Sequence, residues 1–305
     1  MGQDGSPIDW IAVDWGTSNL RVWAMGAAGP IHAAESGDGM GKLSRDQFEP
    51  ALLRLIEPWL GAGEMPVVAC GMVGARQGWL EATYRAVPCA PVVPGDLVAV
   101  PTEDARLRVS IVPGLQQAAP ADVMRGEETQ IAGALALMPN FDGVLCLPGT
   151  HSKWVHVSAG EVVSFQTFMT GEMFALLSQQ SVLRHGMAGD GFDQAAFDQG
   201  VSDAFARPEK IAARLFTLRA EGLLAGLAAD AARARLSGLL IGSELAAAKP
   251  YWLGQRVVLV GVERLSASYA RALATQAVTS EALDATACTL SGLATARGVL
   301  RKAKP

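Results

Sequence analysis

The fold of this chain is decided by residues 8–23, whose sequence is IDWIAVDWGTSNLRVW. An apolar run ends in Asp14, a Gly-Thr-Ser-Asn turn follows, and the alternation of a second strand resumes at Leu20. Such a hairpin directs backbone N–H groups and two hydroxyls to one point beside a carboxylate. The pattern is typical of a phosphate cradle with an adjacent place for Mg²⁺, and equally of an ordinary hairpin turn.

The same pattern recurs in the second half of the chain, in residues 143–157 with the sequence GVLCLPGTHSKWVHV. An apolar strand again leads into a Gly-Thr turn, a hydroxyl stands two residues further on, and an alternating strand follows. Lys153 adds a cation where phosphate oxygens would lie. One such turn in each half predicts two similar lobes that face each other across a central cleft.

A third strand-to-loop signal lies in residues 256–266, RVVLVGVERLS, where Gly261 ends the strand and lets a flat ring approach the backbone closely. The chain has no Gly-x-x-x-x-Gly-Lys-Ser/Thr, Gly-x-Ser-x-Gly or His-Glu-x-x-His motif. The commonest alternative motifs for phosphate handling and hydrolysis are therefore absent.

Composition narrows the class of protein. The chain has 305 residues, half of them hydrophobic, which predicts two lobes with sizeable cores. No apolar run reaches the roughly 18 residues of a bilayer span, and the start lacks a secretory pattern, so we expect a cytoplasmic protein without a membrane partner. The net charge of −5 without a basic block argues against nucleic acid. The four cysteines and four histidines show no metal-site spacing, and we expect the cysteines to be small buried core residues.

A glycine-rich loop, residues 71–79 with the sequence GMVGARQGW, follows the short apolar strand 65–70. Small polar ligands usually bind beyond the carboxyl ends of such strands, although a plain surface loop has the same composition. Arg76 is the candidate for holding a carboxylate, because a planar guanidinium can bind one in two places, and Arg125 and Arg184 are the alternatives.

Residues 122–130, DVMRGEETQ, begin an apolar helix with two adjacent carboxylates. Acids at a helix start commonly complement the helix dipole. Glu127 and Glu128 lie on different sides of the helix, so at most one would point at a given substrate. The sequence leaves open which of the two would accept a proton.

The two hairpins and the strand before Gly261 resemble the nucleotide site of the actin, hexokinase and Hsp70 superfamily. More specific strings are VDWGTSN (13–19), GMVG (71–74), QGW (77–79), RGEETQ (125–130), LPGTHSKW (147–154) and FMTGE (168–172). They look like the 2-dehydro-3-deoxygalactonokinase family over the whole chain. The resemblance implies an α/β fold of two actin-like, ribonuclease H-like lobes, and ATP- and Mg²⁺-dependent phosphorylation of the terminal hydroxyl of 2-dehydro-3-deoxy-D-galactonate in bacterial D-galactonate breakdown.

With this resemblance the candidate residues acquire roles. In the superfamily's sugar kinases an acid after a glycine takes the acceptor proton, which points to Glu127, or failing that Glu128, with Glu where most relatives carry Asp. Asp14 would hold Mg²⁺. The nucleotide-binding candidates are Asp14, Gly16, Thr17, Ser18, Asn19, Arg21, Gly149, Thr150, His151, Ser152, Lys153 and Gly261. The substrate-binding candidates are Gly39, Met72, Arg76, Gln77, Trp79 and Arg125.

Three alternatives remain at this point: a kinase for another sugar or sugar acid, a non-catalytic actin-like regulator, and an enzyme with water as acceptor. We expect a sugar-acid lobe over residues 1–139 and a nucleotide-binding lobe over 140–305, with the last helix able to pack back on the first lobe. The oligomeric state is not readable from the sequence, a homodimer being one option. Periodicity predicts one helix over 208–236, a short helix starting at Gly242, and a final helix over 283–302.

Overall fold

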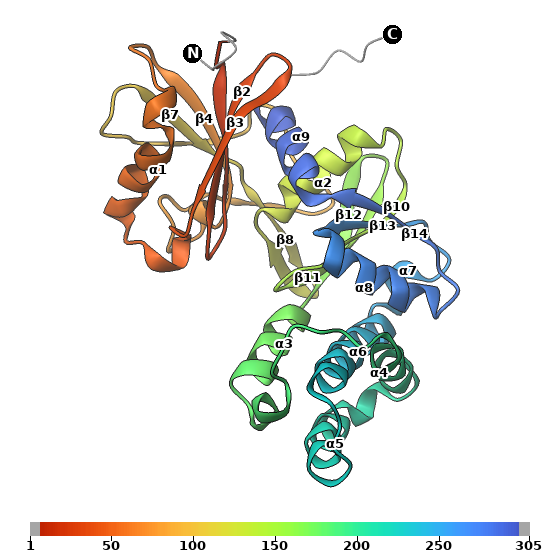
Figure 1. The fold of residues 1–305 in the computed structure, drawn as a ribbon. Helices are drawn as coiled ribbons and strands as arrows, with labels where there is room; N and C mark the ends of the chain where they lie inside the picture. Colours follow the sequence, from red (N-terminus) through yellow and green to blue (C-terminus); the bar gives the residue numbers. More distant parts are fainter. Residues whose placement is uncertain (1–6, 299–305) are drawn as a thin grey trace. The chain divides into compact units, whose positions relative to one another are not determined.

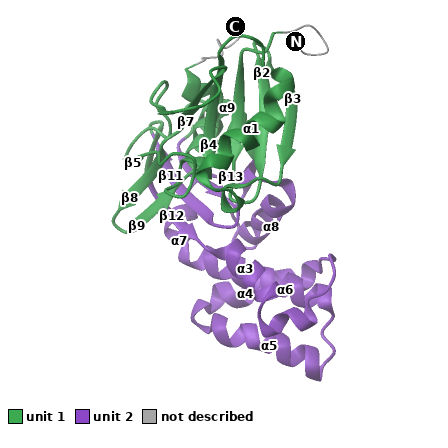
Figure 2. Ribbon diagram, turned by 90° about the vertical axis from the view of Figure 1, so that its left-hand side faces the viewer, with its two compact units in different colours: residues 1–141, 159–163, 285–305 green, residues 142–158, 164–284 purple. Residues whose placement is uncertain are grey.

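The computed structural model describes residues 7–298 and contains two compact units (Figure 2). Unit 1 comprises residues 1–141, 159–163 and 285–305, and unit 2 comprises residues 142–158 and 164–284. Each unit is built around its own β-sheet and has its own apolar core, so each is described separately.

The main sheet of unit 1 has the strand order β3-β2-β1-β4-β7-β6, and Figure 1 labels its strands β2, β3, β4 and β7. Its strands are β1 (Trp10–Trp15), β2 (Leu20–Gly26), β3 (Gly29–Ser36), β4 (Met65–Gly71), β6 (Val98–Val100) and β7 (Leu107–Ile111). The first three strands pair antiparallel, whereas β4 pairs parallel with both β1 and β7. Helix α1 (Phe48–Ile56) buries Phe48 and Leu52 in a core shared with Trp15. Because β1 and β4 run parallel, their carboxyl ends lie at the same edge of the sheet.

A second, three-stranded sheet of unit 1 leads into the helix that carries the paired acids. It consists of β5 (Tyr84–Ala86), β8 (Gly114–Ala118) and β9 (Ala121–Met124). Helix α2 (Glu127–Leu137) follows β9 after two residues, and the last described helix, α9 (Ala285–Arg297), packs against it. A Cβ on Gly133 of α2 would lie 1.8 Å from the Cys288 carbonyl oxygen, and one on Gly292 of α9 would lie 1.8 Å from that of Thr129. The two glycines therefore let the helix backbones touch.

The sheet of unit 2 has the order β12-β11-β10-β13-β14. Its strands are β10 (Gly143–Leu147), β11 (Ser152–Ser158), β12 (Glu161–Phe168), β13 (Val257–Gly261) and β14 (Ser280–Asp284). The first four strands of the two main sheets, β1 to β4 in unit 1 and β10 to β13 in unit 2, have the same 3-2-1-4 order in space. In both, the first two strands are antiparallel and the fourth is parallel to the first; β7 in unit 1 and β14 in unit 2 then pair parallel with that fourth strand. The repeated topology confirms the predicted α/β class with two actin-like, ribonuclease H-like sheets.

Helices fill the remainder of unit 2. They are α3 (Thr170–Gln179), α4 (Gln194–Ala206), α5 (Ile211–Leu224), α6 (Ala229–Ala247), α7 (Lys249–Trp252) and α8 (Glu263–Ala274). Short 3-10 turns occur in both units at Met40–Lys42, Arg45–Gln47, Glu57–Trp59, Met72–Gly74, Val182–Gly186 and Pro208–Lys210. Within unit 2 the helix pair with the most extensive contact is α4 with α6, where a Cβ on Gly238 would meet the Phe197 carbonyl oxygen at 2.1 Å.

Several predicted boundaries are wrong. The single helix expected over 208–236 is two helices, because the chain turns between them at Gly226 with φ +68°. Gly242 does not start a helix but lies inside α6, where it allows close contact with Val201. The final helix begins at Ala285 after a strand, and the end predicted for it at Lys302 lies outside the described residues. Cys70, Cys146 and Cys288 are free and buried as expected, whereas Cys89 is only half-buried.

The contact between α2 and α9 gives a stability prediction. Gly133→Ala should lower the free energy of unfolding by about 3 kcal/mol, because the new methyl group overlaps a backbone carbonyl that cannot move without shifting α9. Thermal unfolding measures the loss. Gly63→Ala is the matched control, since a Cβ there meets nothing within 4 Å. Equal melting temperatures for the two variants would show that the helices can separate at little cost.

Candidate functional site

The turn after β1 is held in place by the loop that contains Gly39. The Gly16 N–H donates to the Asn19 carbonyl over 2.9 Å, and the Gly16 carbonyl accepts from the Met40 N–H at 3.0 Å. A Cβ on Gly39 would lie 2.2 Å from the Ser18 carbonyl carbon. The structure therefore places Gly39 beneath the turn, as its support. The side chains of Thr17, Ser18 and Asn19 are exposed.

Asp14 is the last residue but one of β1 and forms an ion pair with Arg21 of β2, opposite it in the antiparallel register. The Asp14 side chain is 17% exposed. No group of three or more His, Cys, Asp or Glu side chains suited to a metal ion occurs within residues 7–298. One carboxylate matches the way Mg²⁺ is commonly held in phosphate-transfer sites, mainly by phosphate oxygens and water. The donor set therefore fits a magnesium ion that arrives with a nucleotide.

The acids of α2 lie close to Asp14 because three backbone segments approach one another. Gly71 ends β4 with φ +92°, and a Cβ there would meet the Trp15 carbonyl oxygen at 2.6 Å. Gly126 precedes α2 with φ +103°, and its Cβ would lie 3.3 Å from the Gly71 Cα. Burial, followed by the charges of Asp14 and Glu128, raises the pKa of the Cys70 thiol, which places both carboxylates around the end of β4.

The two adjacent acids have different environments. Glu128 is fully buried. Its carboxylate accepts hydrogen bonds from the Gly126 N–H at 2.6 Å and from the Thr129 hydroxyl at 2.9 Å. Burial, and next the Glu127 charge, raise the pKa of Glu128 to about 7. Glu127 is half-exposed, and its carboxylate accepts the Arg125 N–H at 3.1 Å. Of the two, Glu127 is the one that a substrate can reach without disturbing the core.

The loop after β4 has mostly a packing role. Trp79 lies edge-on to Trp15 with ring centroids 6.1 Å apart and stacks on Phe48 at 6.2 Å. The Arg76 side chain is 80% exposed, with Nε 3.7 Å from the Glu81 carboxylate. Gln77 beside it is exposed, and Met72 is half-buried within the 3-10 turn.

Arg125 is the buried cation of this region. Its residue is 9% exposed, its guanidinium lies 4.3 Å over the Tyr84 ring, and Nη2 donates to the Ala82 carbonyl at 2.8 Å. Nε and Nη1 have no hydrogen-bond partner among the described residues, and Nη1 would be 2.7 Å from a Cβ on Gly74. A buried guanidinium with two unpaired nitrogens costs free energy unless an anion completes it.

In unit 2 the second Gly-Thr turn is supported by the start of α3. A Cβ on Gly171 would lie 2.3 Å from the Gly149 carbonyl oxygen, and the Glu172 N–H donates to the Thr150 carbonyl at 2.9 Å. His151 Nε2 lies 2.6 Å from the Glu172 carboxylate. Gly149 is half-exposed and Thr150 is exposed at the tip of this turn.

Ser152 and Lys153, the two residues after His151, are buried. Lys153 is 5% exposed, and its Nζ donates to the His151 carbonyl at 3.2 Å. The Ser152 hydroxyl is fully buried and lies 2.8 Å from the Tyr269 hydroxyl, so the structure assigns Ser152 to the interior. Arg184 also belongs to unit 2, where its Nη1 donates to the Gln180 carbonyl at 3.2 Å.

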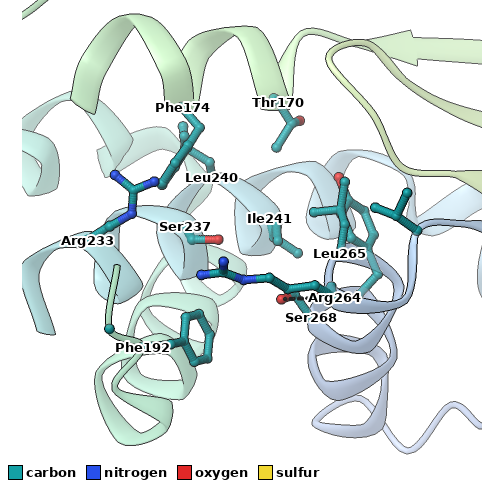
Figure 3. A pocket seen from close by; sticks show the side chains of 14 residues that line it. Thr170, Phe174, Phe192, Arg233, Ser237, Leu240, Ile241, Arg264, Leu265 and Ser268 are labelled. Carbon is teal, nitrogen blue, oxygen red and sulfur yellow. Dashed lines mark hydrogen bonds between the residues drawn. The ribbon is translucent and has the colours of Figure 1, made fainter. Parts of the chain in front are cut away.

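A pocket of about 270 Å³ opens within unit 2 between α3, α6 and α8, beside the end of β13 (Figure 3). A Cβ on Gly261 would lie 3.6 Å from Pro148, so the strand end and the second turn are neighbours. Sequence reasoning missed the side chains that line this pocket, which include Phe174, Phe192, Arg233, Ser237, Ile241, Arg264 and Ser268. The spacing of Arg233, Ser237 and Ile241 along one helix face was the available signal.

The pocket has an apolar lining interspersed with polar side chains, those of Thr170, Arg233, Ser237, Arg264, Ser268 and Tyr269. The Arg233 guanidinium lies 5.0 Å over the Phe174 ring, and Arg264 enters from α8 on the other side (Figure 3). An apolar pocket with a few placed polar groups suits a flat heterocycle joined to a polar chain. The pocket and the Gly149–Thr150 turn belong to the same unit.

The full sequence matches the family described as 2-keto-3-deoxy-galactonokinase over residues 14–296. The chain belongs to this family. It is 40% identical to a probable 2-dehydro-3-deoxygalactonokinase of Rhizobium meliloti, over 94% of this chain and 96% of that protein. It is 34% identical to the 2-dehydro-3-deoxygalactonokinase of Escherichia coli, over 86% and 88% of the two chains. The resemblance inferred from the sequence strings is thus confirmed.

A solved structure agrees with this assignment. The crystal structure of a putative 2-dehydro-3-deoxygalactonokinase from Sinorhizobium meliloti matches with a TM-score of 0.88 and 39% identity, over 97% of this chain and 98% of that one. The members of the family are named as kinases, so this chain is a member of a kinase family. In the described part of the chain no helix has both the length and the apolar character of a membrane span.

Glu128 gives a prediction for the dependence of stability on pH. Its pKa is about 7 in the folded protein against an ordinary value of 4.5, so folding takes up a proton between these values. Its contribution to stability is complete below pH 4.5 and is lost as the pH rises through 7, at up to about 1.4 kcal/mol per pH unit. Glu128→Gln cannot ionise and should therefore flatten the fall in stability between pH 5 and pH 7.5.

Denaturant unfolding at both pH values measures this slope. Glu161→Gln, at an exposed position at the start of β12, is the control and should keep the wild-type slope. If the free energy of unfolding falls with pH equally in wild type and in Glu128→Gln, the buried carboxyl does not titrate in this range.

Proposed function

We propose that this chain is an ATP-dependent kinase that phosphorylates the C6 hydroxyl of 2-dehydro-3-deoxy-D-galactonate, giving the 6-phosphate and ADP, in D-galactonate catabolism. The observation that carries the proposal is the match to the 2-keto-3-deoxy-galactonokinase family over residues 14–296. The free cysteines suit a reducing compartment, and we place the enzyme in the cytoplasm with a small-molecule acid as its partner.

Glu127 is the proposed general base. Phosphoryl transfer needs a group that accepts the proton of the attacking hydroxyl, together with groups that position the phosphates. Glu127 starts α2 with a half-exposed carboxylate, whereas Glu128 is enclosed and holds the Gly126 N–H. We therefore assign the proton transfer to Glu127 and the shaping of the helix start to Glu128.

The nucleotide-binding roles are assigned within each unit. Exposed Thr17, Ser18 and Asn19 in unit 1, and Gly149 and Thr150 in unit 2, are proposed to bind phosphate oxygens through their N–H and hydroxyl groups. The nucleoside is assigned to the pocket beside Gly261. Asp14 would hold Mg²⁺, which neutralises developing charge on the phosphates when bound. Arg21, ion-paired to Asp14, fixes the orientation of that carboxylate.

The carboxylate of the sugar acid is assigned to Arg125. Arg76, the first candidate from sequence, is largely exposed and lies near Glu81. Arg125 is buried two residues before Glu127 and has two guanidinium nitrogens without a hydrogen-bond partner in the described residues. Binding an anion would satisfy this buried cation, and a charge-assisted pair there would be strong.

The test of the function is ADP release measured with Mg-ATP and a panel of 2-keto-3-deoxy sugar acids and neutral hexoses. Wild type should turn over the galactonate derivative. Glu127→Gln should lose about 1,000-fold in kcat, within the range expected for a general base. Glu128→Gln should stay within about tenfold of wild type, because its carboxylate does not meet the substrate. Loss of turnover in Glu128→Gln alone would reverse the assignment, and no acceptor-dependent ADP from any acid would refute the kinase.

Substitutions of Arg125 and Arg76 distinguish the two candidates by their effect on KM. Arg125→Lys keeps the charge but loses the planar fork, and should raise KM for the sugar acid about tenfold with little change in KM for ATP. Arg76→Lys is the matched variant and should leave both constants near wild type. The opposite pattern would move the carboxylate contact to the exposed loop.

A further inference from the structure

A buried carboxylate in unit 2 belongs to no role described so far. Glu244 lies on α6 and is 3% exposed. Its Oε1 accepts the Trp154 indole N–H at 2.8 Å, and its Oε2 accepts the Tyr269 hydroxyl at 2.8 Å and the Thr170 hydroxyl. Tyr269 is joined in turn to the Ser152 hydroxyl at 2.8 Å. Glu244 is therefore the centre of a polar network inside an otherwise apolar core.

Each partner of Glu244 comes from a different element of the proposed ATP site. Trp154 and Ser152 belong to β11, which begins directly after the Gly149–Thr150 turn. Thr170 is the first residue of α3, the helix whose next residue, Gly171, packs on that turn. Tyr269 lies on α8 and lines the nucleoside pocket together with Thr170. One carboxylate thus joins the phosphate turn to two walls of the pocket.

The chemistry of the network requires an acceptor at its centre. Three donors converge on two oxygens. Only a carboxylate can accept a hydrogen bond from all three donors. Burial raises the pKa of Glu244, whereas the donors from Thr170, Trp154 and Tyr269 lower it. An apolar residue at 244 would leave the three donors buried without partners. An amide would place one N–H₂ group against groups that already donate.

We propose that Glu244 is a positioning residue of the nucleotide site, which fixes the phosphate turn and the pocket walls relative to one another without contacting ATP. Glu244 is not among the residues that line the pocket. The inference rests on the proposed placement of ATP in unit 2. Its consequence is selective: loss of Glu244 should weaken nucleotide binding, while the sugar-acid candidates, which belong to unit 1, keep their geometry.

The experiment compares Glu244→Leu and Glu244→Gln with wild type in steady-state kinetics and in the thermal shift produced by a non-hydrolysable ATP analogue. We expect KM for ATP to rise about tenfold in Glu244→Leu and about threefold in Glu244→Gln, which keeps part of the network. KM for the sugar acid should change less than twofold. The analogue should stabilise both variants less than it stabilises wild type.

A control separates positioning from general destabilisation. Leu218→Ala removes a buried side chain of α5 that does not line the nucleoside pocket, and it should lower the melting temperature without changing KM for ATP. If Glu244→Leu fails to fold, Glu244→Gln carries the test. Equal KM values for ATP in Glu244→Gln, Leu218→Ala and wild type would overturn the inference, as would a parallel rise in both KM values.

Ser237→Phe tests the placement on which the inference rests. Ser237 lines the pocket from α6, and a phenyl ring there should fill the pocket and raise KM for ATP. If Ser237→Phe leaves ATP binding unchanged, the nucleoside lies elsewhere and both the placement and the role of Glu244 are refuted. If Ser237→Phe weakens ATP binding while the Glu244 variants do not, only the role of Glu244 is refuted.

Discussion

The close approach of three backbone segments at the end of β1 is the constraint on which the acidic site depends. Gly71 touches the Trp15 carbonyl, and Gly126 touches Gly71, each with a positive φ that a side chain would oppose. A Cβ at Gly71 would clash with the Trp15 carbonyl, and a Cβ at Gly126 would crowd the Gly71 Cα and push the start of α2, with both acids, away from the end of β4. The chemistry of Glu127 is therefore set by two residues that have no functional group of their own.

In unit 2, too, a glycine lets two backbone segments approach each other closely. Gly171 lies against the Gly149 carbonyl, so the start of α3 sits directly under the turn proposed for phosphate. Here the contact is reinforced from within by Glu244, which accepts from α3, β11 and α8 at once. In unit 1 the buried acid next to the turn is Glu128, which instead holds the backbone of its own helix start. Each unit thus has a buried carboxylate that stabilises local geometry and one exposed turn.

The sequence predicts the parts of this architecture that local pattern determines. Both Gly-Thr turns, the strand before Gly261 and the acids after Gly126 follow from alternation and turn chemistry, and they lie where expected. Glu244 is different, since its partners are 25, 74 and 90 residues away and nothing in the Ala-rich helix marks it. The choice between Arg76 and Arg125 also depends on burial, which the chain around each arginine does not reveal. The helix boundary at Gly226 was missed because apolar residues continue through it with helical spacing.

The pairing of α9 with α2 has a consequence for how the protein is made. Residues 285–297 complete unit 1, although residues 142–158 and 164–284, which build unit 2, are synthesised before them. On the ribosome most of unit 1 therefore emerges early. The surface of α2 is covered only after nearly the whole chain has been synthesised, because α9 comes last. During that interval the groove at Gly133 is open, and the helix that bears both acids has its final support only when synthesis ends.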